Sequence, residues 1–205
     1  WRDYAATHSY RSDEVDKKVA FVSEMAAAVR PGMLWDFGCN SGDYSKASLI
    51  AGAKYAVGFD FDHGALEAAF ERAKVEQLEF LPLLMDAANP SPSRGWAERG
   101  PRSRAARATA DAILALAFVH HIAIGRNVPI DRVVDWLVGL APTGIIEFVP
   151  KSDPMVKRML RLREDIFEGY SEESFLAAIA ARARIVKSIV VSAAGRRLVW
   201  FDRSK

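Results

Sequence analysis

Cysteine is nearly absent from this sequence, since Cys39 is the single one in 205 residues. One cysteine cannot form an internal disulfide, which predicts a cytoplasmic protein rather than a disulfide-stabilised secreted one. Long hydrophobic runs are missing as well. The longest unbroken apolar stretch, residues 112–119, falls far short of the roughly 18 residues that a membrane-spanning helix needs. We therefore expect no membrane partner.

Charge of one sign is also lacking, because 28 Lys and Arg residues nearly balance 26 Asp and Glu residues, for a net charge of +2. This balance excludes a protein whose whole surface is built for nucleic acid. The 50% of hydrophobic residues excludes a disordered chain, and the length suits one domain. An initiating methionine is missing too, and since the chain starts at Trp1 we expect it to be part of a longer protein.

Helical and strand-like apolar patterns alternate along most of the chain. Strand-like runs occupy residues 33–37, 55–60, 78–84, 112–119, 145–149, 185–191 and 197–201. Helical patterns lie at about 12–29, 44–51, 66–73 and 128–140, and one more begins near residue 172. Helical crossovers join parallel strands, whereas the short turn at 193–195 favours an antiparallel hairpin. The pattern predicts a single α/β domain over residues 1–205, with a doubly wound, seven-stranded, mostly parallel sheet and an antiparallel C-terminal hairpin.

A glycine-bearing loop follows the first strand, and the second strand ends in an acid. The loop reads Asp36-Phe37-Gly38-Cys39-Asn40-Ser41-Gly42, and Asp60 comes 18 residues after Gly42. In such a sheet ligands bind beyond the carboxyl ends of the strands, and glycines let the backbone approach them closely. The Asp60 carboxylate can accept two hydrogen bonds from a ribose diol. The combination predicts a cofactor of nucleoside type.

The spacing in this loop argues against a dinucleotide. The dinucleotide fingerprint is G-x-G-x-x-G, whereas the loop here is D-x-G-x-x-x-G, with Asp36 directly in front of it. A carboxylate at that point would repel a pyrophosphate but would suit a cationic ligand. The sulfonium and amino groups of S-adenosylmethionine are such charges.

Residues 36–42 resemble motif I of the class I S-adenosylmethionine-dependent methyltransferases, which usually reads D-x-G-C-G-T-G, and the final hairpin is typical of their Rossmann-like fold. The resemblance implies that Asp36 and the backbone of Gly38–Gly42 flank the methionine part of the cofactor. It also implies the contacts to the nucleoside, which are made to the ribose by Asp60, to the adenine face by Phe61, and to the adenine edge by Asp86 and Ala87.

The central glycine of that motif is Asn40 in this chain. Asparagine is the non-glycine residue that most readily adopts left-handed backbone geometry, so the turn can form. Its side chain can also donate to the cofactor carboxylate. Segments 35–40, 118–121 and 146–149 further resemble a narrower group of bacterial methyltransferase-like proteins, some of them nodulation-associated.

Two adjacent histidines, His120 and His121, are expected at the end of the fourth strand, where the acceptor of such an enzyme sits. An oxygen acceptor must lose a proton, and a neutral imidazole can either take that proton or orient the hydroxyl. His121 is the preferred candidate, because adjacent residues at a strand end diverge and only one can face the site. The alternative is that one histidine caps a helix or packs beneath the cofactor.

Glu147 stands in the fifth strand, where an apolar residue is expected. A buried charge is either paired or functional, so Glu147 is predicted to pair with Arg126 or to bind a substrate hydroxyl, with pairing favoured. His120, His121 and Glu147 match no recognised set of metal ligands, and we expect no metal site.

Two further segments bear on the ligands. Tyr10 precedes the first helix, in a segment that in this fold often covers the cofactor, so a cofactor contact is expected. Residues 94–107 carry five arginines and one acid, which favours either contact with RNA phosphates or a solvated surface.

The sequence thus predicts an S-adenosylmethionine-dependent methyltransferase that acts at oxygen of a small or carbohydrate-like acceptor. Two alternatives stay open. One is an RNA or protein methyltransferase that uses the arginine loop, and the other is a non-catalytic cofactor-binding domain that serves as an interaction module.

Overall fold

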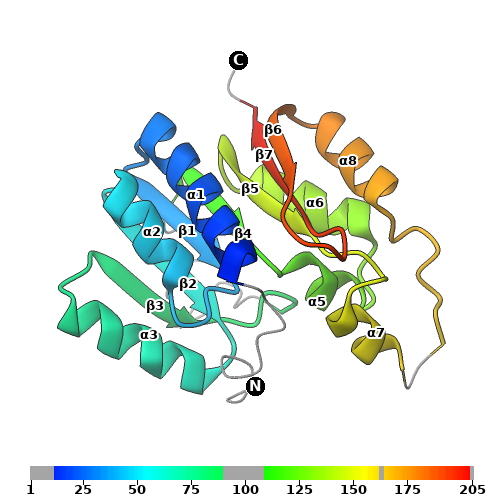
Figure 1. Ribbon diagram of the computed structural model, residues 1–205, viewed down its shortest axis with the longest axis horizontal. Coiled ribbons are helices and arrows are strands. Elements are labelled where there is room, and N and C mark those ends of the chain that lie inside the picture. Colours follow the sequence, from blue (N-terminus) through cyan, green and yellow to red (C-terminus); the bar gives the residue numbers. More distant parts are fainter. Residues whose placement is uncertain (1–11, 90–108, 162–163, 204–205) are drawn as a thin grey trace, which may run out of the picture.

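A computed structural model describes residues 12–89, 109–161 and 164–203 (Figure 1). Its strands are β1 (Met33–Phe37), β2 (Tyr55–Asp60), β3 (Phe80–Leu84), β4 (Ala112–Ala115), β5 (Thr143–Phe148), β6 (Arg184–Val190) and β7 (Arg197–Asp202). Its helices are α1 (Ser12–Val29), α2 (Asp43–Ala51), α3 (His63–Val75), α5 (Val119–Ala123), α6 (Ile130–Gly139), α7 (Pro154–Leu160) and α8 (Glu172–Ala180).

The strands form one sheet in the order β3-β2-β1-β4-β5-β7-β6. Strands β1 to β5 run parallel to one another, and β7 runs antiparallel to both β5 and β6. The predicted seven-stranded, doubly wound sheet with an antiparallel C-terminal hairpin is therefore confirmed. None of the described helices is both long and apolar enough to cross a membrane.

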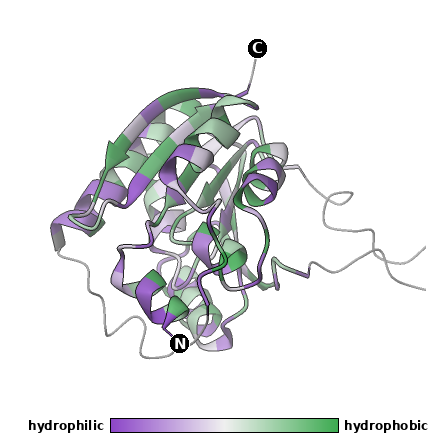
Figure 2. Cartoon of the chain, turned by 90° about the vertical axis from the view of Figure 1, so that its right-hand side faces the viewer, coloured by the Kyte–Doolittle hydropathy of each residue, from purple (hydrophilic) through white to green (hydrophobic). Residues whose placement is uncertain are grey.

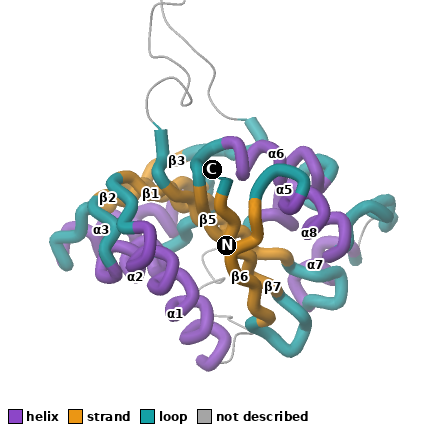
Figure 3. The backbone as a smooth tube through the Cα atoms, turned by 90° about the horizontal axis from the view of Figure 1, so that it is seen from above, coloured by secondary structure: helices purple, strands orange, loops and turns teal. Residues whose placement is uncertain are grey.

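Helices cover both faces of the sheet, with α1, α2 and α3 on one side and α5, α6 and α8 on the other (Figure 3). Strand β4 shows how one short sequence serves both layers. Ala112 and Leu114 pack in the core under α1 to α3, whereas Ile113 and Ala115 pack in the core under α5, α6 and α8. All four side chains are fully buried, as expected for a central parallel strand. Accordingly, hydrophobic colouring gathers along the strands in Figure 2.

Helix α8 begins near residue 172, where the sequence predicts a helix to start. Ser171 caps the helix by accepting a hydrogen bond from the Ser174 backbone N–H at 3.1 Å. Tyr170 and Phe175 both stack on Phe148 of β5, with ring centroids 5.2 and 5.4 Å away. These contacts dock α8 against the end of β5.

One prediction about the fold is wrong, and it concerns the site. The fourth strand was expected to run to residue 119, but β4 ends at Ala115 and His120 and His121 lie in the short helix α5. Ala117 takes a left-handed backbone conformation (φ 49°), which turns the chain out of the strand. Residues 112–119 form one unbroken apolar run across the end of the strand and the turn, so no change of composition marks the break. Helix α7 was likewise not predicted, and it begins at Pro154 after Asp153, which caps it.

We expect Gly58→Ala to lower the free energy of unfolding by about 1–3 kcal/mol, because a Cβ there would lie 2.6 Å from the Cys39 sulfur and 2.7 Å from a ring carbon of Phe80. Gly139→Ala is the matched control. A Cβ at Gly139 meets nothing within 4 Å, so this substitution should raise stability by up to about 1 kcal/mol. Urea denaturation of both variants measures the difference, and equal effects would contradict the packing argument.

Candidate functional site

The candidate site lies at the carboxyl ends of β1 and β4, where the winding of the sheet reverses. β1 pairs with β2 on one side and with β4 on the other, and the connections leave in opposite directions. The loop 38–42 follows β1, and the turn 116–118 follows β4. The glycine loop and the histidine segment therefore leave the sheet side by side.

The loop 38–42 has three residues in the left-handed region, Gly38 (φ 74°), Asn40 (φ 48°) and Gly42 (φ 81°). Asn40 thus takes the backbone geometry expected of it. A Cβ on Gly42 would lie 2.5 Å from a ring carbon of Phe80, so close approach as well as φ requires glycine there. The Gly38 N–H donates to the Phe59 carbonyl at 2.8 Å, which ties the loop to β2.

The Asp60 carboxylate fastens the loop to the end of β2. Its Oδ2 accepts from the Asn40 N–H at 2.9 Å, and its Oδ1 accepts from the N–H groups of Phe61 and Asp62 at 2.8 and 3.0 Å. A carboxylate has about four acceptor positions, and these three bonds leave one of them on Oδ2. A ribose diol can therefore add one hydrogen bond to Asp60 without displacing a backbone donor.

Asp36 is a buried acid without a cationic partner of its own among the contacts of the described residues. It is 1% exposed, and its Oδ2 accepts from the Ser45 hydroxyl at 2.7 Å. Burial, reinforced by the negative charges of Asp60 and Asp43, raises the pKa of Asp36 to about 7. A cation placed beside this carboxyl would favour its ionised form, so the residues present fit a sulfonium or ammonium ligand.

The third strand brings more of the predicted cofactor residues to the same edge. The Met85 N–H donates to the Asp60 carbonyl at 2.8 Å, which places the segment after β3 against the end of β2. Asp86 follows, and its Oδ2 pairs with Arg126 at 3.1 Å. Phe61 is 48% exposed, and Ala87 packs partly buried against the core. Tyr10 and the arginine loop 94–107 lie outside the described residues.

The two histidines are neighbours on α5, with ring centroids 4.1 Å apart, so the expectation that they diverge at a strand end is wrong. His120 is fully buried, and among the described residues neither of its ring nitrogens has a hydrogen-bond partner. Burial and the nearby His121 hold the pKa of His120 well below its usual value. Burial and Arg196 lower the pKa of His121 to about 4. Both imidazoles are therefore neutral at pH 7.

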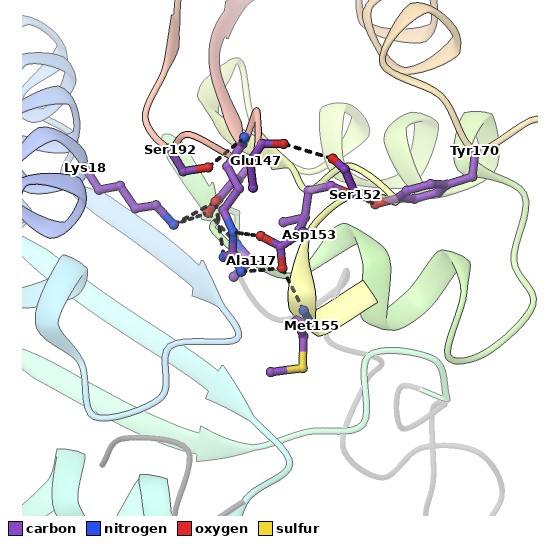
Figure 4. Close-up of polar contacts among 11 residues, drawn as sticks. Lys18, Ala117, Glu147, Ser152, Asp153, Met155, Tyr170 and Ser192 are labelled. Atoms are coloured by element: carbon purple, nitrogen blue, oxygen red, sulfur yellow. Dashed lines mark hydrogen bonds and ion pairs between the residues drawn. The ribbon is translucent and has the colours of Figure 1, made fainter. Parts of the chain in front are cut away.

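Glu147 is the centre of a buried network of charges (Figure 4). Lys18 of α1 reaches both of its carboxylate oxygens, at 2.7 and 2.8 Å, and the Ala117 N–H donates to Oε2 at 2.8 Å. An Arg196 nitrogen lies 3.7 Å from Oε1, and the same guanidinium forms a bidentate pair with Asp153 at 2.6 and 2.9 Å. The charges of two positive and two negative side chains, all of them buried, thus cancel one another.

Glu147 is therefore paired, as favoured, but its predicted partner was wrong, because Arg126 binds Asp86 instead. Sequence reasoning missed Lys18, although a signal existed. Lys18 stands in the apolar stripe of α1 between Val15 and Val22, where a charge needs a partner. Arg196 follows a turn and carries no such signal. Within the described ranges, no three His, Cys, Asp or Glu side chains converge as metal ligands would.

Comparison with known proteins identifies the fold that carries this site. No protein-family model matches the sequence. The nodulation protein NoeA of Rhizobium meliloti (strain 1021) is 48% identical over all 205 residues, and the chain spans 43% of the length of that protein. The N-methyltransferase NodS from Bradyrhizobium japonicum WM9, in complex with S-adenosylhomocysteine, has a TM-score of 0.67 at 12% identity and covers 94% of this chain and 88% of its own. The fold is that of the S-adenosylmethionine-dependent methyltransferases.

A second solved methyltransferase structure agrees. Magnesium protoporphyrin IX methyltransferase from Synechocystis PCC 6803, with bound S-adenosylmethionine, has a TM-score of 0.61 at 20% identity, over 93% of this chain and 78% of its own. The resemblance that the loop 36–42 carries is thus confirmed for the methyltransferase fold.

We expect Lys18→Met and Glu147→Met each to cost roughly 3–5 kcal/mol of folding stability, because each leaves a buried charge without its partner. The double variant should be far closer to the wild type than the sum of the two, since replacing a whole buried pair by apolar side chains is often neutral or stabilising. Urea denaturation of the four proteins gives the coupling energy, and simple additivity would contradict the pairing.

Proposed function

We propose that this chain is an S-adenosylmethionine-dependent methyltransferase that methylates oxygen of a small or carbohydrate-like acceptor. One observation carries the proposal, namely the buried Asp36 carboxyl beside a loop with three left-handed residues that Asp60 fastens to the end of β2. At this edge of the sheet a cationic ligand would neutralise Asp36, and the remaining acceptor position of Asp60 suits a ribose hydroxyl. Methyltransferases solved with S-adenosylmethionine or S-adenosylhomocysteine share the fold.

On this proposal, different residues of the chain contact different parts of the cofactor. Asp36 and the backbone of Gly38–Gly42 flank the methionine part, and Asp60 accepts from the ribose. The Asn40 side chain turns its oxygen to the Ser41 N–H at 2.8 Å, so its amide hydrogens stay available to the cofactor carboxylate. The half-exposed Phe61 lies against the adenine, with Asp86 and Ala87 at its edge and Arg126 behind Asp86.

The acceptor side is assigned to α5. When bound, S-adenosylmethionine supplies a methyl group whose bond to sulfur breaks as its bond to the acceptor oxygen forms. His121 accepts the hydrogen bond of the acceptor hydroxyl and aims its oxygen at the methyl group. Its lowered pKa makes it too weak a base to ionise the hydroxyl beforehand, so the hydroxyl proton passes to His121 only as the new carbon–oxygen bond forms and makes that oxygen strongly acidic. Glu147, which we had expected could bind a substrate hydroxyl, is occupied by Lys18 and Ala117 and is left out of the acceptor site.

An amine acceptor is the second candidate, favoured by the likeness to the N-methyltransferase NodS. An ammonium acceptor must lose its proton before its nitrogen has a lone pair to attack with, and a histidine with a pKa near 4 would accept that proton poorly, whereas a hydroxyl oxygen already has a lone pair. A non-catalytic domain would bind the cofactor without transferring its methyl group, so an assay of methyl transfer distinguishes it from both enzymes.

We expect Asp60→Asn to weaken S-adenosylmethionine binding by about 10- to 100-fold, because its amide nitrogen accepts no hydrogen bond and replaces an oxygen that accepts from the Asn40 N–H and can accept from the ribose. Calorimetry on the folded variant measures this loss. Asp111→Asn, which changes a carboxylate that bonds the Met33 N–H at the far end of β1, is the control. Absence of binding by the wild type would overturn the proposed function, whereas equal affinities for wild type and Asp60→Asn would overturn only the ribose contact.

The affinity for the cofactor should fall as the pH is lowered. Because the pKa of Asp36 is about 7 in the free protein, protons compete with a cationic ligand below that pH, and the affinity for S-adenosylmethionine should drop by up to about 50-fold from pH 7 to pH 5. S-adenosylhomocysteine, which lacks the sulfonium charge, should show a shallower slope. Asp36→Asn should remove the difference between the two ligands. Calorimetry at each pH measures these affinities. If the affinity of wild type and the affinity of Asp36→Asn depend on pH in the same way, Asp36 does not have this role.

The acceptor assignment predicts that His121→Ala lowers kcat on an identified acceptor at least 10-fold while leaving S-adenosylmethionine affinity within about 2-fold. His63→Ala, at the exposed start of α3, is the matched control. Radiolabelled methyl transfer measures both. Full turnover by His121→Ala would remove the histidine from the mechanism.

A further inference from the structure

A hydrogen bond from a backbone N–H to a buried side chain holds the start of the segment that carries the histidines. Ala117 takes φ 49°, a left-handed conformation that a residue with a Cβ avoids unless its surroundings impose it. Its N–H donates to Glu147 Oε2 at 2.8 Å, across 30 residues of sequence. This bond holds the chain at the point where it leaves β4 and turns towards α5.

Helix α5 cannot set its own position. It has five residues, too few to be stable by themselves, and the hydrogen bonds at its two ends run from the His121 N–H to the Phe118 carbonyl and from the Ile124 N–H to the His120 carbonyl, both at 3.0 Å. No hydrogen bond among the described residues holds the His120 ring. The turn 116–118 leads into α5, where the buried Val119 and Ala123 and the following Ile124 pack in the core, so the turn and this packing together set where both imidazoles stand.

The same turn touches the cofactor loop. A Cβ on Gly38 would lie 3.3 Å from a ring carbon of Phe118 and 3.9 Å from the Leu116 carbonyl oxygen. A shift of the turn would thus move the histidines relative to the loop that holds the cofactor, and methyl transfer depends on that distance.

Glu147 is well suited to fix this turn, because it is itself fixed. Lys18 holds both of its oxygens from α1, and Arg196, anchored by Asp153, lies behind it. A buried ion pair often adds no stability over apolar side chains of similar volume, so stability alone does not account for it here.

We propose that Glu147 is a positioning residue, which pins the Ala117 N–H and thereby sets His120 and His121 against the cofactor loop. The catalytic consequence rests on the proposed function, but the pinning itself does not.

Two double variants separate the pin from the ion pair. Lys18→Met with Glu147→Gln removes both charges but keeps an oxygen that can accept from the Ala117 N–H. Lys18→Met with Glu147→Met removes the charges and the acceptor. A third protein adds Ala117→Gly to the Met–Met pair, because glycine takes a left-handed φ without a pin.

The readout is the imidazole NMR spectrum of His120 and His121, with His63 as an internal reference on α3. We expect the Gln variant to keep the wild-type shifts and the wild-type titration of His121, the Met–Met variant to shift both imidazoles and raise the pH at which His121 titrates, and Ala117→Gly to restore the wild-type pattern in part. Equal spectra for the Gln and Met–Met variants would overturn the proposal, whether both are perturbed or neither is.

The wild-type protein gives an independent test if a double variant fails to fold. The Ala117 amide should exchange with solvent at least 100-fold more slowly than the amides of an exposed turn, because it is bonded to a buried carboxylate. Rapid exchange would overturn the pin. None of these readouts needs methyl transfer, so failure to bind S-adenosylmethionine would defeat the proposed function and leave this result standing.

Discussion

Glu147 brings a negative charge to a place that solvent does not reach, and much of the site's architecture follows from neutralising it. Lys18 must come from α1 on one face of the sheet, so the start of that helix is drawn towards the end of β5. Arg196 must come from the turn before β7, and its bond to Asp153 in turn fixes the start of α7. One buried carboxylate thus joins α1, the turn after β4, the C-terminal hairpin and α7.

Asp36 occupies a similar position at the end of β1, yet its chemistry is opposite. Both acids are fully buried, but Glu147 has two cations within 4 Å, whereas the bond that the described residues give Asp36 comes from the neutral hydroxyl of Ser45. The difference explains why burial raises the pKa of Asp36 to about 7. A structural acid receives its counter-charge from the protein, and an acid left short of one is suited to a cationic ligand.

Local sequence signals predicted much of this arrangement. The features that depend on contacts between distant residues could not be predicted. The strands 33–37 and 55–60 and the loop between Gly38 and Gly42 could be predicted, because apolar periodicity and glycine spacing act within a few residues. The partner of Glu147 could not, because Lys18 lies 129 residues away and only the fold brings them together. The end of β4 was missed for a different reason. The break at Ala117 is imposed by a carboxylate from another strand, and the local sequence reads as one apolar run.

The two sides of the site place different demands on what binds there. At the ends of β1 and β2, Asp36 and Asp60 form no ion pair within the described part of the chain, so a positively charged ligand lowers the electrostatic energy. Around α5 the balance is closed, because Lys18 and Arg196 are matched by Glu147 and Asp153, and both histidines are neutral. A charged acceptor would bring an uncompensated charge into this buried region, whereas a hydroxyl would bring none and would offer His121 a hydrogen bond. On the proposed function, this distribution of buried charge favours an acceptor that is neutral when it binds, such as a hydroxyl, over one that stays charged.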